Sequence, residues 1–206
     1  MLLLINTADS KRLFGIVGGT RTEIENLPYQ LAYLSNGKYR CGASLISKDF
    51  ALTAGHCLLK YPLKLTLRAG STYKNQGGIL IKVKQSFFHP YFISTTFQND
   101  FALLNFEKSI NFTNLIQPVK LPTIDQIIYD GTSCTVAGWG KMENKKLSAE
   151  LKSTKVYIIN QYVCQGNYYT SLVRLTITRE MICAGSYFGG SDGKIQFINF
   201  LTINSI

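Results

Sequence analysis

Apolar and polar residues alternate over several short stretches of the chain. Residues 63–68 (LKLTLR) and 81–85 (IKVKQ) have the period of two that is typical of a strand with one buried face. Residues 133–140 and 153–159 have the length and composition of further strands. These stretches predict an all-β fold, either a sandwich or a barrel.

The turn and helix patterns fit the same fold. Asn36-Gly37 separates the apolar runs at 29–34 and 39–46, and this dipeptide between two such runs predicts a tight β-hairpin. Helical periodicity is weak along the chain except around residues 160–168, where one short helical segment is expected.

The composition supports a folded chain with a core of its own. Of the 206 residues, 46% are hydrophobic and 12% are aromatic, which excludes the composition typical of disordered chains. The length suits one large all-β domain or two small ones. The sequence contains no run of about 18 apolar residues, so no membrane span is expected.

The formal net charge of +10 leaves two interpretations open. It reflects lysines scattered over the surface, or it attracts a polyanion such as heparin. The densest basic stretch, residues 141–155, has no aromatic residues between its lysines on which bases could stack. Nucleic-acid binding is therefore not expected.

Five cysteines and two histidines limit the chemistry of the chain. No two cysteines form a C-x-x-C pair, so a zinc site is not expected, and no other metal or cofactor is indicated. Disulfides are the better interpretation, which implies an oxidising compartment and secretion, with one cysteine left over. The apolar run at residues 2–5 is shorter than the roughly 7–15 residues of a signal peptide, so that peptide is expected to be incomplete.

Asn111, Phe112 and Thr113 form an Asn-X-Thr sequence, the acceptor for N-linked glycans in secreted proteins. Short sequences of this kind also arise by chance. The sequence alone leaves both interpretations open.

Six short motifs follow one another along the chain in a specific order and spacing. They are IVGGT (16–20), CGASLISKDFALTAGHC (41–57), NDFALL (99–104), PVKLP (118–122), CTVAGWG (134–140) and MICAG (181–185). The combination resembles the chymotrypsin/trypsin family of serine endopeptidases across roughly residues 16–192. The resemblance implies a chymotrypsin-like double β-barrel and the hydrolysis of peptide bonds.

The resemblance also implies roles for His56, Asp100 and Ile16. His56 matches the histidine that takes the proton of the nucleophilic serine, and Asp100 matches the aspartate that orients this histidine. Asp100 also precedes the apolar run FALL, and a carboxylate carried into burial needs a partner such as an imidazole N–H. Ile16 matches the residue whose freed amino group completes activation in this family.

The same resemblance implies the disulfides Cys41–Cys57 and Cys164–Cys183. Cys134 matches a cysteine whose family partner follows the catalytic serine, but no cysteine follows Cys183 in this sequence. Cys134 is therefore expected to be a free thiol or to pair with another molecule.

The match to the family ends after Asp192. This aspartate falls at the base of the specificity pocket, which implies cleavage after Arg or Lys. Beyond it, Lys194 stands in place of a cysteine and Gln196 in place of the oxyanion glycine. Phe197 replaces the aspartate before the nucleophile, and Ile198 replaces the nucleophilic serine.

Ser191, in the sequence GGSDG, is the nearest substitute for that serine. It follows Cys183 by eight residues, five fewer than the family pattern requires. Five extended residues span up to about 16 Å, whereas catalysis tolerates displacements nearer to about 1 Å. Ser191 is therefore not expected to act as the nucleophile.

The composition of residues 194–206 suggests why the match ends. Most of these residues are Ile, Phe, Asn or Lys, whose codons can all be written with A and T alone. This bias indicates translated noncoding sequence, such as an intron retained after Asp192. A short hydrophobic strand is the alternative.

The expected division of the chain follows from these matches. Residues 1–15 are a remnant of a signal or propeptide, 16–193 the peptidase domain and 194–206 a tail outside the family. Within the domain, the first barrel is expected to be complete over about 16–113 and the second, over about 114–193, to be incomplete.

Three functions fit the sequence. The favoured one is a trypsin-like serine endopeptidase that is inactive as written, because the segment with the nucleophile is missing. The alternatives are a non-catalytic homologue that acts as a binding protein and a barrel that serves only as a scaffold for polyanion binding. The expected partners are polypeptide substrates or protease inhibitors, and the chain is expected to be a secreted monomer.

Overall fold

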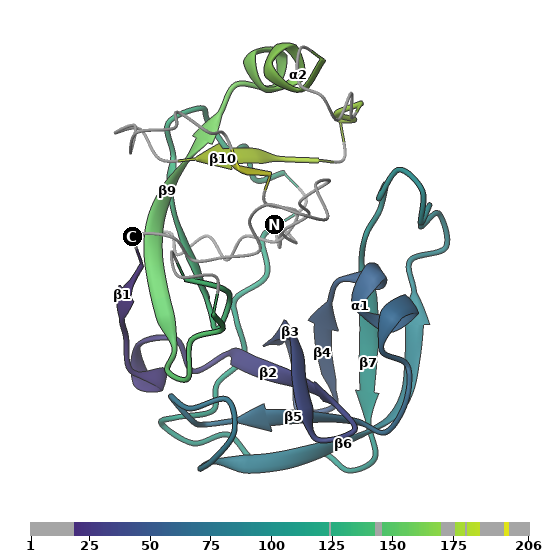
Figure 1. Cartoon of the computed structure of the whole chain (residues 1–206), viewed down its shortest axis with the longest axis vertical. Coiled ribbons are helices and arrows are strands. Elements are labelled where there is room, and N and C mark those ends of the chain that lie inside the picture. The colour runs from purple at the N-terminus through teal and green to yellow at the C-terminus, as the bar shows by residue number, and fades with distance from the viewer. Residues whose placement is uncertain are drawn as a thin grey trace.

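The computed structural model describes residues 19–123, 125–142, 146–169, 176–179, 181–185 and 196–197. These residues form a closed β-barrel and, beside it, a second β-sheet (Figure 1). The all-β expectation is confirmed.

Six strands close the barrel in the order β2-β3-β4-β7-β6-β5. Every pair is antiparallel. Strands β4, β5 and β7 bury alternate residues, as in β7, where Ala102, Leu104 and Phe106 point inward. All six residues of β2 are buried, because this strand also contacts β8 of the second sheet. The bounds are β2 Gln30–Ser35, β3 Lys38–Leu45, β4 Phe50–Thr53, β5 Leu65–Ala69, β6 Ile79–Phe88 and β7 Ala102–Phe106.

The predicted hairpin at Asn36-Gly37 is confirmed. Ser35 pairs with Lys38 across the turn, and the two central residues have positive φ angles of 51° and 71°. Asn and Gly tolerate this left-handed backbone better than other residues, and the resulting turn matches the twist of the flanking strands.

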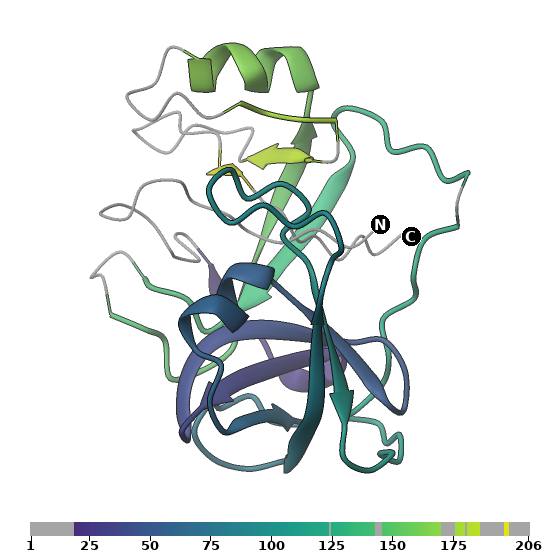
Figure 2. The same cartoon turned by 90° about the vertical axis from the view of Figure 1, so that its right-hand side faces the viewer.

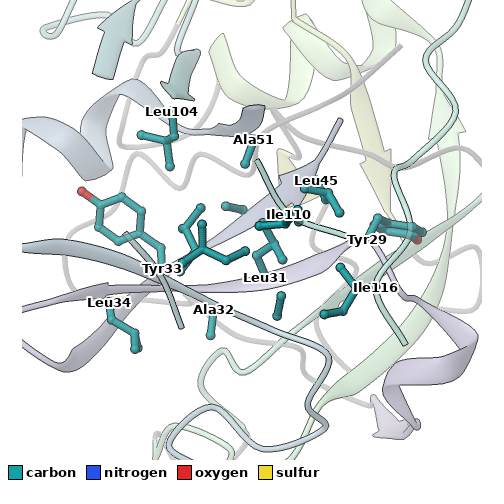
Figure 3. Packing of buried hydrophobic residues seen from close by; sticks show 14 of the residues in the cluster. Tyr29, Leu31, Ala32, Tyr33, Leu34, Leu45, Ala51, Leu104, Ile110 and Ile116 are labelled. Atoms are coloured by element: carbon teal, nitrogen blue, oxygen red, sulfur yellow. The ribbon is translucent and has the colours of Figure 1, made fainter. Parts of the chain in front are cut away.

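The interior of the barrel is filled by aliphatic side chains from facing strands. Leu31, Leu45, Leu67 and Leu104 are all 0% exposed, and Figure 3 shows side chains of β2, β3, β4 and β7 converging on the same interior. Full burial of each such side chain stabilises the fold by about 1.5–3 kcal/mol. The barrel therefore has a closely packed core, to which Trp139 and Leu151 from beside the second sheet also contribute.

The second sheet is built around β9, which pairs with β8 along one edge and with β1 and β10 along the other. β11 adds to β10, so the described strands form an open sheet. Its small core consists of Cys134, Val136, Val156, Ile158 and Ala184. The bounds are β1 Thr20–Arg21, β8 Ser133–Gly138, β9 Lys152–Ile159, β10 Cys183–Gly185 and β11 Gln196–Phe197.

Two strands pair with other parts of the fold than the expected domain bounds implied. β1 pairs with β9 and so belongs to the second sheet, although residues 16–113 were assigned to the first barrel. Gln196 and Phe197, assigned to the tail, pair with Ala184 and Cys183 of β10. The division into domains stays a prediction.

Three short helices complete the described elements: η1 (Ile24–Asn26), α1 (Gly55–Lys60) and α2 (Gln161–Tyr169). α2 confirms the helical segment expected near residues 160–168. The side chain of Asn160 accepts hydrogen bonds from the backbone N–H groups of Tyr162 and Val163 and so caps its start. No described helix has the length and apolar composition needed to cross a membrane.

Trp139 joins the second sheet to the barrel. Its indole Nε1–H donates to the carbonyl of Thr72 at 2.8 Å, and the same carbonyl accepts the backbone N–H of Leu151 at 2.8 Å. The Tyr39 ring packs edge-on against the indole with centroids 5.9 Å apart. Lys74 also donates from Nζ to the carbonyl of Ser148. These contacts hold the two units against each other.

Candidate functional site

Two strands of the barrel bring His56 and Asp100 together. β4 ends at Thr53 and β7 begins at Ala102, and these residues pair across antiparallel strands. The chain therefore leaves β4 and enters β7 at the same end of the barrel. α1, which carries His56, lies at the end of the barrel that faces the second sheet (Figure 2).

The carboxylate of Asp100 holds His56 at two points. Oδ2 accepts a hydrogen bond from Nδ1 of the imidazole at 2.7 Å, and Oδ1 accepts one from the backbone N–H of His56 at 2.8 Å. Because a carboxylate oxygen accepts this bond, the ring proton lies on Nδ1. The lone pair of the neutral ring then lies on Nε2, which can act as a base.

Burial makes this contact stronger than it would be in water. The Asp100 side chain is 1% exposed and the His56 side chain 12% exposed. A buried carboxylate is costly unless it is hydrogen-bonded, and bonds to an ionised acceptor are among the strongest in proteins. The imidazole partner that the sequence analysis required for a buried Asp100 is present.

Asp100 also caps α1. The N-cap residue Ala54 has no side chain that could accept the free N–H groups at the start of the helix. The Asp100 carboxylate accepts the N–H of His56 instead, and its negative charge lies at the favourable end of the helix. One carboxylate thus positions both the backbone and the ring of His56.

A loop before β7 covers the same site. Phe97 packs edge-on against the His56 ring, with centroids 6.0 Å apart and an interplanar angle of 89°. Phe97 and Asn99 have positive φ angles of 56° and 49°, a backbone conformation that non-glycine residues adopt at a cost of about 1–3 kcal/mol. The Asn99 side-chain amide donates to the carbonyl of Tyr91 at 3.0 Å, which ties the loop down.

Both disulfides implied by the resemblance are present in the structure. Cys41–Cys57 joins β3 to α1, directly beside His56, and Cys164–Cys183 joins α2 to β10. Cys134 is a free thiol and only 2% exposed. Burial raises the pKa of this thiol to about 11.

Among the described residues, one group of side chains has potential metal-ligating atoms close together. One ligand atom each of Cys41, His56 and Cys57 lies within 4.8 Å of the others. Both sulfurs are bonded to each other in a disulfide, so neither is the thiolate that a metal site of this kind would need. The group is therefore a disulfide next to a histidine.

Several residues singled out from the sequence lie outside the described residues. These are Ile16, Ser191, Asp192, Lys194 and Ile198. Gln196 and Phe197 are described only as strand β11.

Phe97 beside His56 and the helix cap formed by Asp100 were not predicted from the sequence. The cap could not be read locally, because its acceptor lies 44 residues away along the chain.

Comparison with known proteins places most of the chain in one family. The family described as Trypsin matches residues 16–194. Trypsin 5G1 of Aedes aegypti is 38% identical over 179 residues, which cover 86% of this chain and 66% of that protein. The vitellin-degrading protease of Bombyx mori is 32% identical over 179 residues, covering 86% and 67%. The chain thus spans about two thirds of the length of these relatives.

Solved structures share the fold. Neuropsin, a serine protease expressed in the limbic system of mouse brain, superposes with a TM-score of 0.75 at 26% identity, covering 90% of this chain and 84% of its own. An inactivated protease paralogue of the scabies mite, S-D1, superposes with a TM-score of 0.77 at 24% identity. That second match covers 82% of this chain and 74% of the paralogue.

Proposed function

Because the chain belongs to the trypsin family of serine endopeptidases, we propose that His56 and Asp100 are the general base and the orienting carboxylate of a site that hydrolyses peptide bonds. The observation that carries the proposal is the double contact of one buried carboxylate with the Nδ1–H and the backbone N–H of His56. This contact leaves Nε2 as the only basic nitrogen of the ring.

The proposed chemistry follows from that tautomer. Nε2 accepts the proton of a serine hydroxyl while the serine oxygen bonds to the carbonyl carbon of the substrate. The resulting imidazolium returns this proton to the leaving amine nitrogen as the C–N bond breaks. Asp100 keeps the ring oriented and stabilises its positive charge throughout.

The second part of the proposal is that residues 189–198 do not supply the nucleophile. Gln196, Phe197 and Ile198 replace the oxyanion glycine, the aspartate and the serine of the family pattern. Removing the serine from an intact protease of this mechanism lowers turnover by about 10⁶-fold. The 206-residue polypeptide is therefore an endopeptidase by family that does not turn over substrate.

Further assignments rest on the same family relationship. Asp192 would direct binding to Arg or Lys side chains, and the partners would be polypeptide substrates or protease inhibitors. The two disulfides favour an oxidising compartment and hence secretion. The chain is proposed to act as a monomer.

The proposed lack of hydrolytic activity is tested by measuring substrate turnover by the refolded polypeptide. An arginyl-amide substrate and a fluorophosphonate probe are applied to the chain and to its His56→Ala variant, and neither protein should react above background. Hydrolysis that is lost in the His56→Ala variant would contradict the proposal and would indicate another serine, with Ser191 examined first by Ser191→Ala.

The role of the dyad is tested by NMR, independently of turnover. The Nδ1–H proton of His56 should resonate far downfield, and the ¹⁵N shifts of the neutral ring should show the proton on Nδ1 and the lone pair on Nε2. Asp100→Asn, which is similar in shape but uncharged, should shift the ring toward the other tautomer. An unchanged tautomer in this variant would remove Asp100 from its orienting role.

A non-catalytic binding protein is the second candidate, favoured by the presence of His56 and Asp100 without the serine pattern. It predicts that the inactive chain still binds a polypeptide inhibitor of trypsin. Absence of binding by calorimetry, with authentic trypsin as the positive control, would exclude this candidate.

A further inference from the structure

The Asn-X-Thr sequence at residues 111–113 lies on the surface of the barrel, in the connection that follows β7. Asn111 and Thr113 are both exposed. In the described part of the chain, the side-chain amide of Asn111 takes part in none of the hydrogen bonds or ion pairs. Its Nδ2 is therefore available to an enzyme that approaches from solvent.

The residues around Asn111 hold its backbone in place. Ile110 is buried, and its N–H donates to the carbonyl of Lys48 at 2.9 Å. Phe112 is partly buried against the barrel core and lies under the ammonium of Lys48, 5.8 Å from its ring centroid. Because side chains alternate along an extended segment, the inward Phe112 leaves Asn111 and Thr113 facing outward.

Thr113 is also held in a defined position. Its backbone N–H donates to the carbonyl of Ile116 at 2.9 Å, and the N–H of Ile116 donates back to its carbonyl at 3.1 Å. Among the described residues, the Thr113 hydroxyl oxygen accepts only the N–H of Leu115, at 3.2 Å, and its own hydroxyl proton donates to none of them. The acceptor sequence is thus presented on a short, ordered turn.

The turn lies at the end of the barrel remote from His56. Ile110 is hydrogen-bonded to Lys48, which lies just before the first residue of β4. His56 lies after the last residue of β4, at the opposite end of the strand. β7 likewise runs from the Asp100 end to the connection that carries Asn111. The five residues of β7 separate the two ends by about 14 Å, since a strand rises about 3.4 Å per residue.

From this placement we propose that Asn111 is a site of N-linked glycosylation. The amide Nδ2 forms a bond to the anomeric carbon of an oligosaccharide and loses one proton. The bond between that carbon and a phosphate oxygen of a lipid diphosphate donor breaks, and the lipid diphosphate leaves. The two disulfides are consistent with the oxidising compartment in which this transfer takes place.

A glycan at this position adds a bulky, hydrated group to one end of the barrel. It leaves the side of the molecule around His56 and Asp100 accessible. The modification is therefore compatible with binding of a polypeptide at the candidate site, and it does not depend on whether the chain turns over substrate.

The test uses the full chain behind a cleavable secretion leader, translated in the presence of microsomes. Leader cleavage identifies the chains that have entered the lumen, and only these are scored. The chain should run as one species of lower mobility that returns to the peptide position after treatment with an amidase specific for N-glycans. In ¹⁸O water that treatment should convert Asn111 to a labelled Asp, detected in the tryptic peptide.

Three variants separate the acceptor sequence from other effects. Thr113→Ser keeps a hydroxyl and should retain the modification, whereas Thr113→Ala and Asn111→Gln should lose it completely. A leader-cleaved parent chain without the mobility shift would overturn the proposal, and so would a shift that persists in Thr113→Ala. The downfield Nδ1–H resonance of His56 should be the same in Asn111→Gln and in the parent chain.

Discussion

The closed barrel and the second sheet differ in how completely they enclose their residues. The barrel strands pair in a ring, and Leu31, Leu45, Leu67 and Leu104 in its interior are all 0% exposed. The second sheet is open in the described residues, and in its small core Val136 and Ile158 retain 7% and 6% of their surface. His56 and Asp100 both come from the closed barrel.

This difference explains why the contact between His56 and Asp100 is well formed without support from the second sheet. The contacts that hold His56 arise from β3, β4, β7 and α1, which all belong to the barrel or are bonded to it. His56 and the carboxylate that contacts it therefore depend on one structural unit.

Truncation of one core side chain in each unit should give the largest effects. Such truncations lower the free energy of unfolding by about 2–5 kcal/mol. Leu104→Ala in the barrel should fall near the upper end of this range, at about 5 kcal/mol. Ile158→Ala in the second sheet should fall near the lower end, at about 2 kcal/mol. The closed barrel cannot collapse around the cavity, whereas the open sheet can relax. Urea unfolding followed by fluorescence of the single tryptophan, Trp139, measures both. Equal losses would contradict the comparison.

Removal of each disulfide should cost about 2–4 kcal/mol. The two bridges close loops of similar length, with separations of 16 and 19 residues, so the entropic contribution should be nearly the same for both. Only the double variant Cys41→Ser/Cys57→Ser should also weaken the Nδ1–H resonance of His56, because this bridge holds α1. An equal change of the resonance in Cys164→Ser/Cys183→Ser would show that the dyad depends on the second sheet as well.

Two glycine substitutions should have the same effect in both units. Gly37 in the barrel hairpin and Gly131 before β8 have φ angles of +71° and +80°, and an added Cβ would meet nothing within 4 Å at either position. Gly37→Ala and Gly131→Ala should therefore each cost only the left-handed backbone, about 1–2 kcal/mol. A loss of unfolding free energy several-fold larger for Gly37→Ala than for Gly131→Ala would mean that backbone strain costs more in the barrel than in the second sheet. The difference between Leu104→Ala and Ile158→Ala could then not be attributed to packing alone.

The buried thiol of Cys134 should make the stability of the chain depend on alkaline pH. Burial raises its pKa from the ordinary 9.0 to about 11, so the folded state keeps its proton at a higher pH than the unfolded state does. The stability that this proton confers is fully present below pH 9.0 and is lost as the pH rises toward about 11. The unfolding free energy of the parent chain minus that of Cys134→Ala should therefore decrease as the pH rises from 9.0 to about 11.

The reactivity of the same thiol provides an independent measurement. At neutral pH Cys134 should react with a disulfide reagent only after the chain is unfolded in urea, because the thiol is buried and protonated. Burial also argues against pairing with a second molecule in the folded state. Rapid labelling of the native protein would mean that the second sheet opens far more readily than the barrel.

Local patterns predicted those elements whose residues are close together in the sequence. The alternation at 63–68 and 81–85 corresponds to β5 and β6, and Asn36-Gly37 forms the expected hairpin. α1 was not predicted, because a helix of six residues is too short to show a periodic pattern and its cap comes from Asp100. The pairing of β1 with β9 joins residues 20–21 to 152–153, and no local pattern indicates such a contact.

In the candidate site, too, some residues were predicted from the sequence and one was not. The motifs around His56 and Asp100 identified both residues, and the position of each cysteine relative to the family identified the two bridges. Phe97 was missed because its contact with His56 depends on a loop held by positive φ angles and by the bond from Asn99 to Tyr91.

By itself, the sequence determined the strand periods, the hairpin, the family and the two residues of the dyad, because each of these depends on the order and spacing of neighbouring residues. Only the tertiary structure decided that one carboxylate would bind both the ring and the backbone of His56, and that the turn at Asn111 would lie at the opposite end of the barrel. Both depend on the antiparallel pairing of β4 with β7. That pairing brings together segments about 50 residues apart, and hydrogen bonds between distant strands set its register rather than any pattern along the chain.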